Sequence, residues 1–349
     1  MTGFSSHQNL KFAPTTESAD TIDATAAMPS KLVGRFAPTP SGRMHLGNVF
    51  SALLGWLAVR SAGGKMVLRI EDLDPRAQQP KLARLLMDDL HWLGLDWDEG
   101  PTYQSERKQI YESALELLKS RKLVYPCFCS RAELHAAKAP HTSDGTYIYQ
   151  GTCRNLSPAE IADKSHIKRP AYRLRVPELG NPKELVGFDD LIWGHQEEHL
   201  AQDCGDFLIR RSDEVFAYQL AVVVDDAAAG VNLVVRGRDL LGSVARQTYL
   251  AKLLELPVPR YAHVPLLIAS DGRRLSKREQ DLDVGFLRAK GVSSARLIGG
   301  LAALVGLAPP GIEALPADLC QYFDWDTLRN HRSDIVINDE VLQSLGIYR

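Results

Sequence analysis

Long apolar runs are missing from this sequence. None of its 349 residues belongs to an uninterrupted apolar stretch of the roughly 18 residues that a membrane-spanning helix requires. An excess of charge of one sign is missing too, because 41 Lys and Arg residues stand against 43 Asp and Glu residues. We therefore expect no membrane partner and no globally basic surface, so that any contact with RNA has to come from a local patch.

Residues 1–30 lack both apolar periodicity and arginine. They are rich in Ser, Thr and Ala, and their one Lys and three acids account for the whole net charge of −2. A signal peptide needs a basic start followed by an apolar stretch, and a mitochondrial presequence needs Arg. Because neither pattern is present, we expect a disordered tail at 1–30 and a cytoplasmic protein.

Cysteine is scarce as well, and its distribution is uneven. Three of the five cysteines fall in one loop-rich stretch: Cys127, Cys129 and Cys153. Clustered thiolates suit a tetrahedral structural zinc, one per chain, and disulfides are disfavoured in the cytoplasm. The spacing reveals no fourth ligand, and His141 is the generic candidate. Cys204 and Cys320 are isolated and are expected to be small buried residues.

Apolar periodicity predicts an α/β fold. A strand at 33–37 ends in a Pro-Thr-Pro-Ser-Gly loop, a helical pattern covers 49–59, and a strand follows at 66–70. Such a strand–loop–helix–strand unit begins a parallel sheet. Helical patterns recur at 81–93 and 105–118, residues 127–153 look loop-like, and apolar runs at 217–226, 231–236 and 264–269 are expected to be strands. From 287 onward the pattern is mostly helical.

The loop that follows the first strand has the composition of an anion site. It reads Arg35-Phe-Ala-Pro-Thr-Pro-Ser-Gly-Arg-Met-His45-Leu-Gly47-Asn48. A strand that turns directly into a helix directs backbone N–H groups and the positive helix end toward an anion such as a triphosphate. His45 can donate to charge that develops on the α- and β-phosphates, and Gly47 leaves room for adenine. Taken alone, this loop also fits an ordinary turn with a surface histidine.

A second, basic loop lies about 230 residues further on. It reads Arg274-Leu275-Ser276-Lys277-Arg278. Lys277 is a cation suited to phosphates in a transition state, and Ser276 can donate a further hydrogen bond. Without the first loop, this stretch would be read as a solvated basic turn.

Together the two loops resemble the HIGH and KMSKS signatures of class I aminoacyl-tRNA synthetases. The resemblance implies a Rossmann-type catalytic domain in which an amino-acid carboxylate attacks the α-phosphate of ATP, which is bound with Mg²⁺. It implies catalytic roles for His45 and Lys277, and an ATP site that also contains Gly47 and Ser276. No nucleophile from the enzyme is expected, because positioning and electrostatic stabilisation suffice.

Three more stretches resemble blocks of the glutamyl-tRNA synthetases: Arg69–Asp74 (RIEDLD), Tyr218–Asp226 (YQLAVVVDD) and Val235–Leu241 (VRGRDLL). Glutamate offers two carboxylates and one ammonium group, and Arg35 and Arg236 can each grip a carboxylate. Glu71 can hold the ammonium group, and Tyr218 can cap the side chain. Thr39 stands where the family usually has Ser, which keeps the hydroxyl.

Several acids near these blocks have a structural alternative. Arg69, Asp72 and Asp74 can form an ion-pair network, which is the favoured interpretation for Asp74. Asp225 and Asp226 fit a structural role equally well. All of these acids are left out of the catalytic set.

The length of the chain after the second loop suggests which group accepts the activated amino acid. A complete glutamyl-tRNA synthetase carries a helical anticodon-binding region beyond this point, whereas about 70 residues follow Arg278 here. The chain is therefore similar to the short paralogues within this family. Their resemblance implies that L-glutamate is activated without tRNA and is then transferred to the queuosine base in the anticodon loop of tRNA(Asp). Tyr149 matches a tyrosine zinc ligand of these paralogues and is favoured over His141.

The resemblance covers about residues 33–280 and implies a division of the chain. We expect a Rossmann-type catalytic domain in two halves, 31–120 and 201–285, around an inserted zinc-containing subdomain of the acceptor-binding type at 121–200. Residues 286–349 are expected to form a short helical unit, and the protein is expected to be a monomer.

Other functions remain open from the sequence. One is a truncated glutamyl-tRNA synthetase that charges the 3′ end of tRNA(Glu). Another is a non-catalytic paralogue that binds tRNA, but a degenerate binder should have lost some of the signature residues, and all are present. A nucleotidyltransferase with the same His-x-Gly step would have no use for residues suited to glutamate.

Overall fold

The computed structural model describes residues 31–136, 148–273, 275 and 282–347. Its first half contains three parallel strands in the order β1-β2-β3, and helix α1 follows β1. The elements are β1 (Val33–Phe36), α1 (Leu46–Arg60), β2 (Lys65–Ile70) and β3 (Glu99–Tyr103). The predicted strand–loop–helix–strand unit is thereby confirmed.

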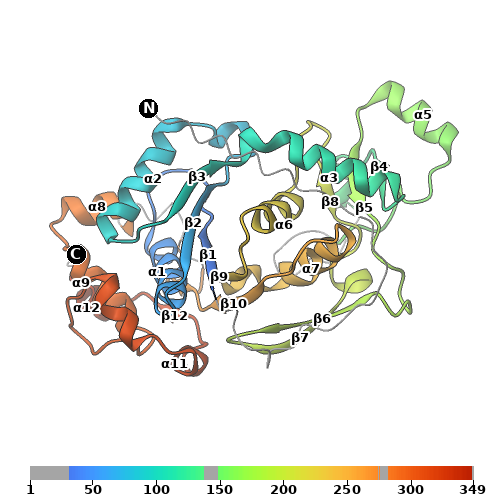
Figure 1. The fold of residues 1–349 in the computed structure, drawn as a ribbon. Helices are drawn as coiled ribbons and strands as arrows, with labels where there is room; N and C mark the ends of the chain where they lie inside the picture. The colour runs from blue at the N-terminus through green and yellow to red at the C-terminus, as the bar shows by residue number, and fades with distance from the viewer. Residues whose placement is uncertain (1–30, 137–147, 274, 276–281, 348–349) are drawn as a thin grey trace.

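A second set of strands lies on the other side of β1. Its order is β7-β6-β10-β9, in which β9, β10 and β6 run parallel and β7 is antiparallel. These strands are β6 (Leu185–Asp190), β7 (Gly194–His199), β9 (Leu233–Gly237) and β10 (Arg260–Val264). Hydrogen bonds between Val33 and Asn232 place the start of β9 beside β1. The chain order of the parallel layer therefore reverses between β1 and β9 (Figure 1).

Both faces of this layer are buried, which its side-chain alternation makes plain. Along β9, Leu233 and Val235 join one apolar cluster while Val234 joins another. Successive side chains of a strand point to opposite faces, so helices cover the layer on both sides. One face carries α1, α2 (Pro80–Leu93) and the C-terminal helices; the other carries α3 (Lys108–Ser120), α6 (Tyr218–Ala228) and α7 (Val244–Leu253).

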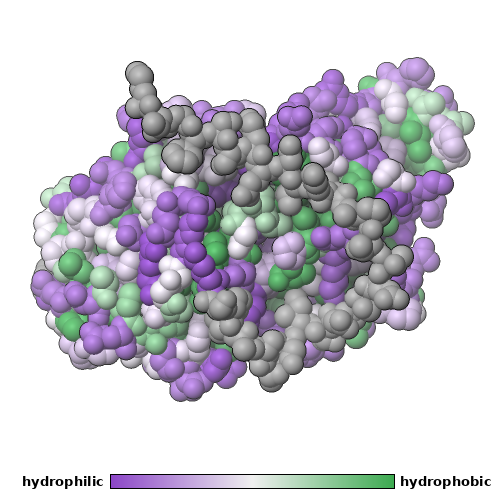
Figure 2. Space-filling model, viewed as in Figure 1, coloured by the Kyte–Doolittle hydropathy of each residue, from purple (hydrophilic) through white to green (hydrophobic). Residues whose placement is uncertain are grey.

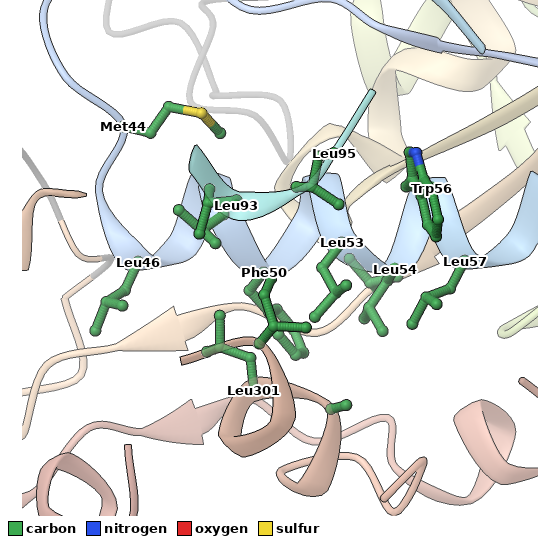
Figure 3. Packing of buried hydrophobic residues seen from close by; sticks show 14 of the residues in the cluster. Met44, Leu46, Phe50, Leu53, Leu54, Trp56, Leu57, Leu93, Leu95 and Leu301 are labelled. Atoms are coloured by element: carbon green, nitrogen blue, oxygen red, sulfur yellow. The ribbon is translucent and has the colours of Figure 1, made fainter. Parts of the chain in front are cut away.

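Helix α1 is the centre of the first cluster. Figure 3 shows Leu46, Phe50, Leu53, Leu54 and Leu57 projecting from the side of α1 that faces Leu301 in the C-terminal part of the chain. All of these side chains are fully buried. The C-terminal unit is thus packed directly on the helix that follows the first signature loop.

The expected strand at 217–226 is wrong, because this segment is helix α6. Every residue from Gln219 to Asp226 is buried, so the helix is enclosed on all sides. Burial on every side removes the 3.6-residue periodicity, and a short apolar run then looks the same as a buried strand. The run at 264–269 is divided between the end of β10 and the two-residue strand β11 (Leu267–Ile268).

An antiparallel sheet of three strands lies at the side of the parallel layer. Its order is β4-β5-β8, made of β4 (Val124–Cys127), β5 (Ala171–Leu174) and β8 (Leu208–Arg210). Helix α4 (Arg131–Ala136) interrupts the stretch that was expected to be a loop. Helix α5 (Pro158–Ile167) begins with a capping box at Ser157 and projects at the upper right of Figure 1.

The C-terminal residues are mostly helical, as predicted. They form α8 (Val284–Ala289), α9 (Ser294–Ala303), α10 (Pro316–Leu319), α11 (Trp325–Asn330) and α12 (Asp339–Ser344). A short strand, β12 (Ile335–Val336), pairs in parallel with β11. This pairing and an ion pair between Arg238 and Asp334 at 2.5 Å attach the C-terminal unit to the parallel layer.

Hydrophilic residues cover much of the face drawn in Figure 2, with apolar residues in small separate groups. Of the helices in the described ranges, none combines the length and the apolarity that crossing a bilayer would require.

We predict that Gly299→Ala in α9 destabilises the protein by about 1–3 kcal/mol, the usual cost of forcing atoms into a packed core. An added Cβ would lie 2.2 Å from the backbone oxygen of Ile312. The matched control is Gly55→Ala in α1, whose Cβ would lie 3.5 Å from Val235 and should be neutral or stabilising by up to about 1 kcal/mol. Urea unfolding of both variants measures the difference, and equal midpoints would contradict the packing described here.

Candidate active site

A cavity of about 520 Å³ opens at the carboxyl ends of β1 and β9, where the strand order reverses. Open α/β sheets bind their ligands in this position. The cavity wall contains every described residue that the sequence assigned to ATP or glutamate: Arg35, Thr39, His45, Gly47, Glu71, Tyr218 and Arg236. Ser276 and Lys277 lie outside the described residues, but Leu275 immediately before them lines the same cavity.

The first signature loop delivers the start of α1 to this cavity. The His45 carbonyl accepts the amides of Asn48 at 2.9 Å and Val49 at 3.1 Å, so His45 is the first residue of the helical turn. No acidic residue lies in that turn, which leaves the positive end of a 15-residue helix uncompensated beside the cavity. Gly47 is confined by the imidazole, because a Cβ there would lie 3.1 Å from His45 Cε1.

A buried aspartate of α2 holds the loop in place. Asp89 Oδ2 accepts the Met44 amide at 3.0 Å, and its other oxygen pairs with Arg43. Asp88 pairs with Arg43 at 3.1 Å and with Arg288 of α8 at 2.6 Å. Asp89 is not among the residues predicted from the sequence, although an acid on the apolar face of an amphipathic helix is a detectable signal.

Two buried arginines form the opposite wall. Arg35 Nη1 donates to the carbonyl of Val235 at 3.4 Å, and its Nε lies 3.5 Å from Asp226 Oδ1. Arg236 Nη1 donates to the hydroxyl of Tyr218 at 3.2 Å. The side chains come from adjacent strands, so two cationic groups face one cavity from one edge of the sheet.

Glu71 follows the end of β2 and completes this wall. Its amide donates to the Pro38 carbonyl at 3.0 Å, which ties it to the first loop. Burial raises the pKa of its carboxyl group, while the charges of Arg69 and Arg35 act in the opposite direction. A further cation beside Glu71, such as a substrate ammonium group, would favour the ionised form.

Asp225 and Asp226 belong to a buried network behind the cavity. Asp226 pairs with Arg69 at 2.6 Å. Asp225 pairs with Arg107 at 2.7 Å and accepts the hydroxyl of Tyr111 at 2.7 Å. Neither acid lines the cavity, so their placement agrees with the structural interpretation.

The other acids of the first block also have structural partners. Asp74 caps the following turn and pairs with Arg76 at 2.7 Å. Asp72 accepts the amide of Ser105 at 2.9 Å and its hydroxyl at 2.6 Å. The contacts of Asp74 and Asp72 fix the ends of neighbouring elements.

The cysteines predicted to bind zinc form a separate cluster in the antiparallel part of the chain. The Sγ atoms of Cys127, Cys129 and Cys153 all lie within 4.8 Å of one another. The hydroxyl of Tyr149 lies 3.5 Å from Cys127 Sγ and 3.6 Å from Cys129 Sγ, and it accepts the Cys153 amide at 2.7 Å. His141 lies outside the described residues. Cys204 is buried, as expected, and Cys320 is partly buried.

Comparison with known families identifies the chain. The family described as tRNA synthetases class I (E and Q), catalytic domain, matches residues 31–343. The protein therefore belongs to the class I tRNA synthetases, a family of ligases, and the resemblance carried by its two loops is confirmed.

Sequence relatives point to the short paralogues. The chain is 48% identical over 295 residues to the glutamyl-Q tRNA(Asp) synthetase of Nitratidesulfovibrio vulgaris, covering 82% of this chain and 90% of the relative. It is 47% identical over 327 residues to the protein of the same name in Symbiobacterium thermophilum, covering 90% and 98%. The corresponding protein of Nocardia farcinica is 44% identical over 314 residues, covering 88% and 94%.

Solved structures support the fold. The glutamate tRNA ligase of Elizabethkingia meningosepticum, in complex with its amino acid, superposes with a TM-score of 0.74 at 24% identity, covering 90% of this chain and 68% of the other. The glutamate-tRNA synthetase of Elizabethkingia anophelis gives 0.75 at 24% identity, covering 90% and 70%. The predicted α/β catalytic fold with its parallel sheet is confirmed.

We predict that Asp89→Ala lowers both stability and affinity for ATP, because it leaves the Met44 amide without its acceptor and leaves Arg43 with only the more exposed Asp88 as an ion-pair partner. Loss of a buried acceptor costs about 1–3 kcal/mol. Asp88→Ala is the matched control: its side chain is 51% exposed, so its ion pairs contribute at most about 1 kcal/mol. Thermal unfolding and ATP titration compare the variants. A larger loss of stability and of ATP affinity in Asp88→Ala than in Asp89→Ala would contradict the assigned role of Asp89.

Proposed function

We propose that this chain activates L-glutamate with ATP and transfers it to the queuosine base in the anticodon loop of tRNA(Asp). One observation carries the activation step: a single cavity brings two buried arginines, a partly buried glutamate and a tyrosine hydroxyl beside the positive end of α1. The acceptor is supported by the shared name of the relatives, which are 42–48% identical to this chain.

In the proposed glutamate site each charged group of the substrate meets a side chain of opposite charge. Arg35 and Arg236 bind the two carboxylates of the substrate, Glu71 binds its ammonium group, and Tyr218 and Thr39 offer hydroxyl groups. Glutamine would leave a buried guanidinium without an anionic partner, and an unpaired buried charge is costly. This arrangement therefore favours glutamate over its amide.

In the first step an oxygen of the α-carboxylate attacks the α-phosphorus of ATP. The bond between this phosphorus and the oxygen that bridges to the β-phosphate breaks, and pyrophosphate leaves with the electron pair. His45, Lys277 and Ser276 stabilise the phosphate charge by hydrogen bonds and electrostatic attraction, and Gly47 admits adenine. Mg²⁺ bound with ATP supplies further neutralisation of the phosphates.

In the second step a hydroxyl of queuosine attacks the carbonyl carbon of the glutamyl adenylate. The bond from that carbon to the phosphate oxygen breaks, AMP leaves, and the hydroxyl proton passes to the released phosphate or to water. The product is a glutamyl ester on the base. The proposed location is the cytoplasm, where ATP and tRNA are used. The proposed oligomeric state is a monomer, since one chain supplies all residues of the proposed site.

The cysteine cluster fits a structural zinc. Thiolate sulfurs on a tetrahedral zinc with bonds near 2.3 Å lie about 3.8 Å apart, and Cys129 Sγ lies 3.6 Å from Cys153 Sγ. Tyr149 suits the fourth position because its oxygen accepts a backbone N–H, which stabilises a phenolate. The four ligands would be Cys127, Cys129, Tyr149 and Cys153, and the metal would hold β4 against the loop that contains Tyr149.

The proposed function is tested with labelled glutamate, ATP and purified tRNAs. We expect ATP–pyrophosphate exchange that depends on glutamate and needs no RNA, and labelling of tRNA(Asp) only when it carries queuosine. A tRNA(Asp) without its 3′-terminal adenosine should be labelled equally well, because the acceptor is in the anticodon loop. Labelling that requires the 3′ end, or that occurs on tRNA(Glu), would establish a truncated glutamyl-tRNA synthetase instead. No exchange under any condition would favour a non-catalytic paralogue.

Metal analysis tests the zinc site. The purified protein should contain close to one zinc per chain, and Cys129→Ser should lose it because one thiolate is removed. Cys320→Ser is the control and should keep the metal. Tyr149→Phe should weaken retention of zinc during dialysis against a chelator, whereas His141→Ala should not. A folded wild-type chain without metal would refute the site.

A further inference from the structure

Behind the cavity wall lie two residues, His263 and Asp190, that the proposed mechanism does not use. His263 of β10 is fully buried and is the register partner of Arg236 in β9. Its Nδ1 lies 2.6 Å from Asp190 Oδ2, and its Nε2 lies 3.0 Å from Arg236 Nε. A histidine thus lies between a carboxylate at the end of β6 and one of the two arginines proposed to bind glutamate.

The hydrogen-bond chemistry fixes the state of this histidine. A guanidinium group has only donors, so His263 Nε2 must be the acceptor of the bond from Arg236 Nε. The ring is therefore neutral and carries its proton on Nδ1, which donates to Asp190. Burial lowers the pKa of His263 to about 4; Asp190 opposes this shift and the charge of Arg236 adds to it. The ring consequently stays an acceptor at neutral pH.

Asp190 is itself held in position by backbone groups. Its Oδ1 accepts the amides of Ile192 at 2.9 Å and Trp193 at 3.0 Å, in the turn between β6 and β7. Oδ2 is thereby directed to His263. A carboxylate that accepts from Nδ1 selects the tautomer in which Nε2 can accept from arginine.

Counting donors shows what this arrangement leaves for a substrate. A guanidinium has five N–H groups, one on Nε and two on each terminal nitrogen. Within the described residues, Arg236 uses Nε for His263, Nη1 for Tyr218 at 3.2 Å and Nη2 for the Leu240 carbonyl at 3.2 Å. No described residue accepts the second N–H of either terminal nitrogen. Two N–H groups on the terminal nitrogens can bind a carboxylate in a bidentate fork.

We propose that His263 is a positioning residue for glutamate: it holds Arg236 Nε, with Asp190 fixing its tautomer, so that both terminal nitrogens face the substrate carboxylate. The inference rests on the proposed role of Arg236 in glutamate binding. In the absence of His263, the guanidinium could turn about its terminal bonds and would pay an ordering cost on binding.

Two amide substitutions separate positioning from a general role in stability. His263→Asn keeps a donor that reaches Asp190 but has no atom that extends to Arg236, whereas His263→Gln places its amide oxygen near the former Nε2. We expect His263→Asn to raise the KM for glutamate roughly ten- to hundredfold, the effect of losing a hydrogen bond to a charged group. The KM for ATP should stay unchanged, and His263→Gln should recover most of the affinity. His166→Asn on the exposed surface of α5 is the control.

Exchange assays with glutamate and ATP varied separately give both KM values, and thermal unfolding reports the folded state of each variant. An unchanged KM for glutamate in folded His263→Asn would overturn the inference. Equal rises in the KM for glutamate and the KM for ATP in both variants, together with lower stability, would also overturn the inference. If Arg236→Lys leaves the KM for glutamate unchanged, the proposed glutamate site itself fails, and the inference with it.

A measurement on the wild-type protein does not depend on how the variants fold. Nitrogen NMR of histidine-labelled protein at pH 7, with the His263 signals assigned by comparison with His263→Gln, distinguishes a protonated from an unprotonated ring nitrogen. We expect a neutral ring with the proton on Nδ1. A proton on Nε2, or a charged ring, would overturn the proposed orientation of Arg236.

Discussion

Asn232 joins the two halves of the catalytic sheet, and the candidate site depends on this junction. Its side-chain oxygen accepts the Val33 amide at 2.8 Å, its own amide donates to the Val33 carbonyl at 3.0 Å, and its side-chain nitrogen donates to Lys31 at 2.9 Å. These bonds connect residues 199 to 201 positions apart in the chain. They align β1 with β9, so that Arg35 and Arg236 reach the same cavity from neighbouring strands.

Helix α6, on the face of the layer opposite to α1, contacts both Arg35 and Arg236. Its first residue, Tyr218, contacts Arg236, and Asp226, eight residues or about 12 Å along the helix, contacts Arg35 and Arg69. Buried cations are tolerated only where such partners compensate their loss of hydration. One helix therefore contributes both a cavity hydroxyl, on Tyr218, and the carboxylate of Asp226, which compensates the burial of Arg35.

The sequence revealed what is encoded locally. Arg35 and His45 were predictable because a strand, a turn and a helix start follow one another within a dozen residues. Helix α6 was missed because complete burial removes its periodicity, and the apolar spacing then favours a strand. The contact between His263 and Arg236 could not be predicted either, since it requires the register of β9 against β10, which spacing along the chain does not contain. Tyr149 was singled out as a zinc ligand by family resemblance, whereas the residues alone made His141 the generic candidate.

The sheet order also has a consequence for biogenesis. During translation at roughly 5–20 residues per second, β1 leaves the ribosome about 10–40 seconds before β9. Until then a nascent β1-β2-β3 unit presents β1 as an unpaired parallel edge, the kind of edge that invites aggregation. Because Arg236 and His263 emerge long after β1, β2 and β3, neither glutamate nor its adenylate can stabilise this early unit, and the nascent chain must depend on its own packing or on chaperones until both halves meet.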